Sequence, residues 1–100
     1  PEEEDWQAAR EGLARARAAM LSCRYDLVIL DEINVALSMK LVDEAAVLEL
    51  VAARPATVEL VLTGRCASPA VMAAADLVTE MREVKHYYRA GVEARDGIER

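Results

Sequence analysis

Two acidic residues follow directly on an aliphatic run in the first half of the chain. The run is Leu27–Leu30, and Asp31 and Glu32 come next. Carboxylate oxygens are the hard ligands that Mg²⁺ takes in proteins, often together with phosphate oxygens. Many ordinary strands also end in aspartate. A magnesium site is therefore one interpretation of this pair, and a solvated strand end is the other.

Basic side chains follow two later aliphatic segments. They are Arg65, Arg82, Lys85 and His86. Arginine and lysine bind phosphate oxygens, and the carboxyl ends of parallel strands open on one edge where ligands bind. Together with the carboxylates, these side chains predict a site for a magnesium–polyphosphate ligand. Taken singly, Arg65 is equally typical of a solvated residue after a strand, and Lys85-His86 of a polar turn.

The elements that must position these residues alternate between two periodicities. Apolar residues spaced three and four apart predict a buried helical stripe over residues 2–22. The aliphatic run at 27–30 predicts a parallel strand buried on both faces, and further strands are expected at 58–62 and 77–81. The remaining expected elements are a short helical piece within 33–41, a helix capped by Asp43 that ends at Pro55, a helix opened by Ser68, and a turn or short helix at 84–90. This alternation predicts an α/β fold with a parallel sheet and flanking helices.

Composition narrows the class of protein. The chain has 100 residues, 54% of them hydrophobic, and a net charge of −6 without a basic block, which argues against nucleic-acid binding. Cys23 and Cys66 stand far apart and form neither a zinc motif nor a disulfide framework. No apolar run reaches the roughly 20 residues of a membrane span. We expect a reduced, cytoplasmic protein.

Several stretches, taken in order, carry a family resemblance. They are Val28–Asn34, Ala36-Leu37, Arg54-Pro55, Leu60–Arg65, Ala75–Met81, Val84–His86, Ala90–Val92 and Gly97–Glu99. The ordered set resembles the ATP:cob(I)alamin adenosyltransferases of the corrinoid-biosynthesis type, from about Trp6 to Glu99.

The resemblance implies a phosphate-loop, RecA-like nucleotidase fold and a cytoplasmic homodimer. It also implies a Mg²⁺-dependent transferase that moves the 5′-deoxyadenosyl group of ATP to the cobalt of a reduced corrinoid, releasing triphosphate. The corrinoid would be cob(I)alamin or an earlier intermediate such as cobyrinic acid a,c-diamide. Because the reduced cobalt is itself the nucleophile, the protein would orient carbon 5′ and neutralise the departing triphosphate.

Residue roles implied by the resemblance fall on the same acidic and basic positions. Glu32 would face the magnesium ion, and Asp31 would bind it directly or from a second layer. Arg65 would contact the polyphosphate. Lys85 and His86 match the family pattern as nucleotide-binding candidates without a defined role, and no catalytic residue is implied.

The chain also departs from the family pattern. The lysine-containing phosphate loop with its strand, and an aromatic segment that helps to shape the corrinoid pocket, are expected before Pro1. Arg95 stands where glutamine is expected, and Arg100 where an aromatic residue is common. We therefore expect residues 1–100 to form a single partial domain that does not bind ATP productively alone. The alternatives are another phosphate-loop ATPase, or an inactive domain that acts only in assembly through an exposed sheet edge.

Overall fold

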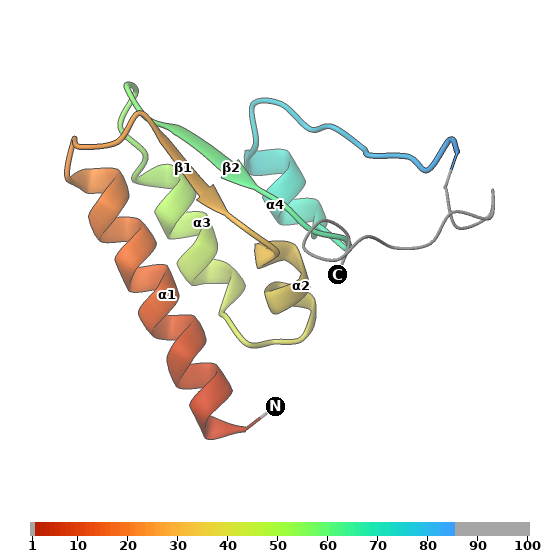
Figure 1. Ribbon diagram of the computed structural model, residues 1–100, viewed down its shortest axis with the longest axis horizontal. Coiled ribbons are helices and arrows are strands. Elements are labelled where there is room, and N and C mark those ends of the chain that lie inside the picture. Colours follow the sequence, from red (N-terminus) through yellow and green to blue (C-terminus); the bar gives the residue numbers. More distant parts are fainter. Residues whose placement is uncertain (1, 86–100) are drawn as a thin grey trace.

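The computed structural model describes residues 2–85 and is an α/β arrangement of short elements (Figure 1). In chain order these are α1 (Glu3–Leu21), β1 (Leu27–Leu30), α2 (Ile33–Ser38), α3 (Glu44–Ala52), β2 (Glu59–Leu62) and α4 (Pro69–Ala74). The four predicted helices and the first two predicted strands are confirmed. The ends of α1 and the start of β2 differ from the prediction by one residue. None of the described helices is long and apolar enough to cross a membrane.

Helix α1 begins in an acidic first turn. The backbone N–H of Glu2 donates to the Asp5 carboxylate at 2.9 Å, and the acidic side chains lie near the positive end of the helix dipole. The predicted stripe is fully buried at Met20, half-buried at Leu13, and partly exposed at Trp6. The C-terminal half of α1 therefore anchors the helix to the core.

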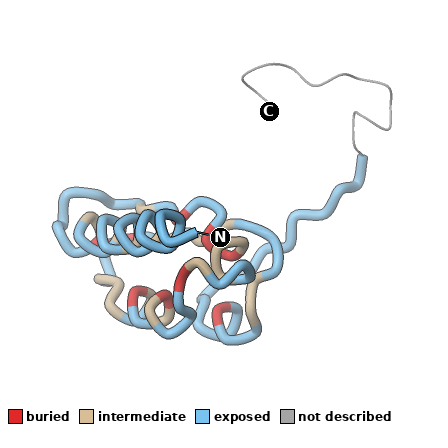
Figure 2. The backbone as a smooth tube through the Cα atoms, turned by 90° about the horizontal axis from the view of Figure 1, so that it is seen from below, coloured by how far each residue is buried: buried red, intermediate tan, exposed pale blue. Residues whose placement is uncertain are grey.

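The two strands pair in parallel and in register. Leu27 lies beside Glu59, and Leu30 beside Leu62. Side chains on one face of this pair pack under α1, α2 and α3, and Figure 2 shows the buried residues in short stretches of these elements. The core consists of Met20, Leu30, Ile33, Val42, Val47, Leu50 and Val58.

The other face of the sheet is exposed, so the prediction that β1 is buried on both faces is wrong. Leu27 is 52% exposed and Ile29 is 55% exposed. Val61, the neighbour of Ile29 in β2, is also exposed. The aliphatic run therefore alternates between core and surface, because the helices in the described part of the chain cover only one face.

The third strand predicted at 77–81 is also wrong. Residues 77–85 follow α4 as an extended segment without strand pairing, and Figure 1 shows this segment leading away from the sheet. Met81 is 92% exposed. Strand formation requires a neighbouring ladder, and within residues 2–85 β1 and β2 pair only with each other. The turn or short helix expected at 84–90 lies largely outside the described residues.

Candidate functional site

The loop after β1 places two carboxylates at the carboxyl edge of the sheet. Asp31 and Glu32 are exposed and lead directly into α2. Glu32 is the N-cap of α2 and adopts a left-handed conformation with φ 59° and ψ 21°. Residues other than glycine seldom adopt this conformation unless the surrounding contacts impose it. The backbone of Glu32 is therefore held in place by its neighbours.

Thr63, at the end of β2, supplies the first of these contacts. Its hydroxyl accepts a hydrogen bond from the backbone N–H of Glu32 at 2.9 Å and donates one to Asp31 Oδ1 at 3.0 Å. The backbone N–H of Thr63 donates to the carbonyl of Leu30 at 3.2 Å. The ends of β1 and β2 thus form one strand-end cluster, which we define as Asp31, Glu32, Thr63, Gly64 and Arg65.

Gly64 allows the two loops of the strand-end cluster to approach closely. Its φ is +114°, and a Cβ atom at this position would lie 3.3 Å from both Asn34 Cβ and Glu32 Cα. Such contacts are tighter than ordinary van der Waals packing, and the left-handed conformation disfavours any side chain. Because residue 64 is glycine, the backbone just before Arg65 can lie against the backbone of Glu32.

The Glu32 carboxylate and the Arg65 guanidinium have no hydrogen bond or ion pair with other residues in the described range. Asp31, by contrast, accepts the Thr63 hydroxyl. The cluster therefore offers one unpaired anionic side chain and one unpaired cationic side chain from neighbouring loops. A metal ion bound to a phosphate group would satisfy both, because the carboxylate can bind the metal and the guanidinium can bind the phosphate.

Magnesium fits this set of donors in part. Residues 2–85 contain no group of three or more His, Cys, Asp or Glu side chains arranged to hold a metal ion. Mg²⁺ is commonly bound by only one or two carboxylates and completes its octahedron with phosphate oxygens and water. Asp31 and Glu32 match that pattern, which requires a phosphate-bearing ligand at the same edge.

The basic residues predicted from the third strand end lie away from the cluster or outside the described range. Arg82 and Lys85 are exposed on the extended segment that leads away from the sheet (Figure 1), and the structure does not bring them to the strand-end cluster. The convergence of three strand ends is therefore wrong in this structure, although that of the first two is confirmed. His86 lies outside the described residues.

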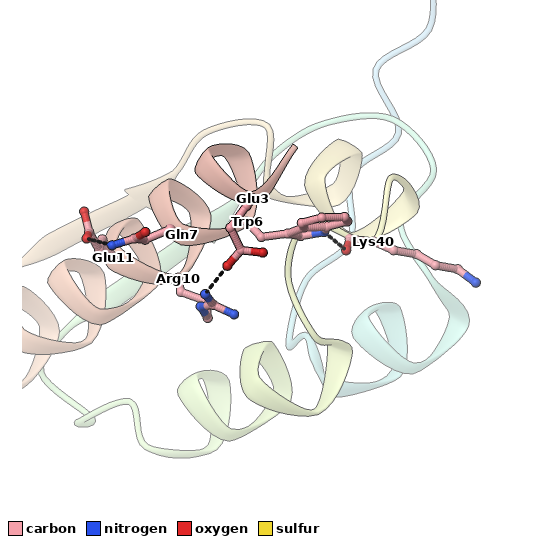
Figure 3. A network of polar contacts seen from close by, with 6 residues as sticks. All are labelled: Glu3, Trp6, Gln7, Arg10, Glu11 and Lys40. Carbon is pink, nitrogen blue, oxygen red and sulfur yellow. Dashed lines mark hydrogen bonds and ion pairs between the residues drawn. The ribbon is translucent and has the colours of Figure 1, made fainter. Parts of the chain in front are cut away.

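A groove of about 820 Å³ lies next to the strand-end cluster, because Cys66, which follows Arg65 in the chain, lines it. Its walls come from α1 and from the connection between α2 and α3, and include Trp6, Arg10 and Lys40. In Figure 3 the Trp6 indole Nε1–H donates to the carbonyl of Lys40 at 3.1 Å, and Arg10 forms an exposed ion pair with Glu3 at 3.7 Å. The indole thus joins the start of α1 to the connection that follows α2.

Two positions of this region carry contacts that sequence reasoning missed. Thr63 and Asn34 lie in the motifs that carry the family resemblance, but the sequence alone predicts no role for either. Thr63 donates and accepts across the two strand ends, and Asn34 is a buried amide in the first turn of α2. A polar residue between Ile33 and Val35, in an apolar stretch, was the signal available for Asn34.

Comparison with protein families gives an unambiguous match. The model of the ATP:corrinoid adenosyltransferase family BtuR/CobO/CobP matches residues 1–100. The chain belongs to this family. The resemblance seen in the ordered motifs is thereby confirmed, and the observed α/β arrangement is compatible with it.

Individual relatives in the family show the same likeness. The chain is 48% identical over 73 residues to the corrinoid adenosyltransferase of Pseudomonas aeruginosa. The aligned residues cover 73% of this chain and 36% of that protein. It is 40% identical over 98 residues to the corrinoid adenosyltransferase of a Sinorhizobium species, covering 97% of this chain and 42% of that protein. It is 32% identical over 97 residues to the corrinoid adenosyltransferase of Escherichia coli K12, and this alignment covers 97% of this chain and 50% of that protein. The chain thus spans half or less of the length of these relatives.

Proposed function

We propose that the protein transfers the 5′-deoxyadenosyl group of Mg-ATP to the cobalt of a reduced corrinoid. The proposal is supported by membership of the ATP:corrinoid adenosyltransferase family. The observation that carries it to particular residues is the strand-end cluster, where Glu32 and Arg65, unpaired within residues 2–85, come from adjoining loops. The corrinoid is cob(I)alamin or cobyrinic acid a,c-diamide, and the enzyme works as a cytoplasmic homodimer.

The reaction is an alkylation and not a phosphoryl transfer. The electron pair of cobalt(I) forms a bond to carbon 5′ of ATP, and cobalt becomes formally cobalt(III). The bond between carbon 5′ and its oxygen breaks, and its electron pair leaves with the triphosphate. The protein supplies no nucleophile, so its contribution is to align the two substrates and stabilise the growing negative charge on the leaving group.

Each proposed site residue has a role in that charge balance. Glu32 would hold the magnesium ion, with Asp31 beside it as a direct or second-layer ligand. When bound, magnesium neutralises part of the triphosphate charge. Arg65 donates hydrogen bonds to the triphosphate, a contact that suits its planar guanidinium. Lys85 and His86 are further nucleotide-binding candidates. The lysine-containing loop expected of the RecA-like nucleotidase fold would complete the site, so we propose that residues 1–100 alone do not bind ATP productively.

The test is a spectroscopic assay of the intact protein with ATP, Mg²⁺ and chemically reduced cobalamin. We expect the absorption spectrum of an alkylcobalt corrinoid to appear. Hydrolysis of ATP to phosphate without that spectrum would support a different phosphate-loop ATPase instead. Absence of both reactions would favour a domain that acts only in assembly.

The Glu32→Gln variant tests the assigned metal ligand. The substitution preserves size but removes the anionic charge, so we expect the rate to fall at least roughly tenfold and more Mg²⁺ to be needed. Glu59→Gln is the matched control, since Glu59 is an exposed carboxylate at the opposite end of the same two-stranded sheet. Equal rates for the two variants would remove Glu32 from the metal site.

A further inference from the structure

Asn34 is buried although it is polar. It is 5% exposed and is the one buried polar residue within the described range 2–85. It lies in the first turn of α2, two residues after Glu32. Burial of an amide is costly unless its donors and acceptor are satisfied, so the contacts of Asn34 require a specific explanation.

Both donor groups of Asn34 reach the end of β2. Its backbone N–H donates to the carbonyl of Thr63 at 3.1 Å, and its side-chain Nδ2 donates to the carbonyl of Gly64 at 3.0 Å. Because a carbonyl can only accept, the contact with Gly64 also fixes which end of the amide is the nitrogen. Asn34 therefore clamps two consecutive residues of the β2 loop against the start of α2.

The acceptor of the same side chain is left without a partner. Asn34 Oδ1 is buried and accepts no hydrogen bond from the residues that the structure describes. An apolar side chain of similar shape would avoid the cost of that unpaired oxygen, while the carbonyl of Gly64, an exposed residue, could turn to water. Stability alone thus gives little reason for asparagine. What the amide provides is the fixed distance between the two loops.

That distance governs the geometry of the strand-end cluster. The clamp keeps Gly64 against the left-handed backbone of Glu32, whose N–H donates to the Thr63 hydroxyl. Arg65 follows Gly64 directly, so a shift of this loop moves Arg65 relative to Glu32. We propose that Asn34 is a positioning residue, which holds Glu32 and Arg65 at the spacing that a magnesium–triphosphate group requires. This inference rests on the function proposed above.

The test uses the intact protein carrying Asn34→Leu, a substitution that removes the amide and keeps the branched shape and the number of side-chain heavy atoms. We expect exchange of the backbone amide hydrogens at positions 32 and 34 to become roughly tenfold faster, because one hydrogen bond of the clamp is lost. The Mg²⁺ concentration for half-maximal adenosyl transfer should rise by about 10- to 100-fold. The melting temperature should change by less than about 4 °C.

Ile33→Val is the matched control, since Ile33 is a buried neighbour in the same turn of α2. It should lower the melting temperature without changing the Mg²⁺ dependence. The proposal is overturned if Asn34→Leu leaves both exchange and Mg²⁺ dependence unchanged, or if Ile33→Val raises the Mg²⁺ requirement equally. If Asn34→Leu does not fold, Asn34→Ser is judged by the same criteria.

Failure of the proposed function would be seen separately. An unsubstituted protein that forms no alkylcobalt corrinoid refutes that function, and hydrogen exchange then decides the clamp alone. Faster exchange confined to residues 31–35 and 63–65 would support the clamp. Unchanged exchange there would overturn it.

Discussion

Four residues other than glycine adopt a left-handed backbone conformation in the described part of the chain, and they are of two kinds. Cys23 and Lys40 directly follow the C-caps of α1 and α2, where a left-handed residue commonly ends a helix. Glu32 and Cys66 do not follow a helix; both lie in the loops at the carboxyl edge of the sheet. The conformations at Glu32 and Cys66 therefore reflect the packing of the two loops, and not helix termination.

Gly64→Ala tests how closely the loops must approach. The new methyl group would meet Glu32 and Asn34 at 3.3 Å, in a backbone conformation that alanine disfavours. We expect the free energy of unfolding to fall by about 1–3 kcal/mol. Chemical denaturation measures the change.

Gly12→Ala provides the comparison for that experiment. Gly12 lies inside α1, and nothing lies within 4 Å of a Cβ atom placed there. We expect this variant to be more stable by about 0.5–1 kcal/mol, because alanine favours the helix. Loss of stability in both variants would mean that the contacts around Gly64 do not explain its effect.

At the residue scale the sequence indicates candidate residues more readily than their geometry. Asp31, Glu32 and Arg65 are candidates because charged residues after aliphatic runs are visible in the printed order, and their roles stay predictions. The roles of Thr63 and Asn34 were not predictable, since they arise from contacts with residues about thirty positions away. Such contacts exist only after β1 and β2 have paired.

Helix starts show how far local sequence determines an element. The predicted cap at Ser68 is confirmed, because its hydroxyl accepts the backbone N–H of Val71 at 3.2 Å. Asp43 occupies the predicted cap position of α3, but its side chain makes no capping hydrogen bond. The residue type thus predicted both boundaries, but only one of the two capping bonds.

Ser68→Ala should therefore cost more than Asp43→Ala. We expect Ser68→Ala to lower the free energy of unfolding by about 1 kcal/mol, because an N–H of the first turn of α4 loses its acceptor. Asp43→Ala should cost less than half as much, since it removes only the charge near the helix dipole. Thermal denaturation of the two variants tests the order. A larger effect at Asp43 would contradict the capping assignment.

The error at residues 77–81 has a cause at the element scale. Valine and threonine favour strands, but this preference is realised only where a neighbouring strand offers its N–H and C=O groups. The printed order of residues contains no information about which strand edge is available. The same limit explains why Lys85 could be expected at the strand-end cluster from sequence, yet lies on a segment that leads away from it.

For the molecule as a whole, the main feature within residues 2–85 is a sheet with one covered and one open face. Leu27, Ile29 and Val61 form the open face with Glu59 beside them. The covered face belongs to the core of α1, α2 and α3. An aliphatic face in water is a surface for association, and a two-stranded sheet gains stability from further contacts.

We expect residues 1–100, prepared alone, to associate through this open face. Ile29→Lys places a charge at its centre, so the average mass measured by sedimentation should fall towards that of a monomer. Because Ile29 is 55% exposed, the free energy of unfolding should change by no more than about 0.5 kcal/mol. Leu21→Lys alters another exposed aliphatic residue, at the end of α1, and should leave association unchanged. If Leu21→Lys disperses the chain as well as Ile29→Lys does, association depends on general surface hydrophobicity and the open face has no special part in it.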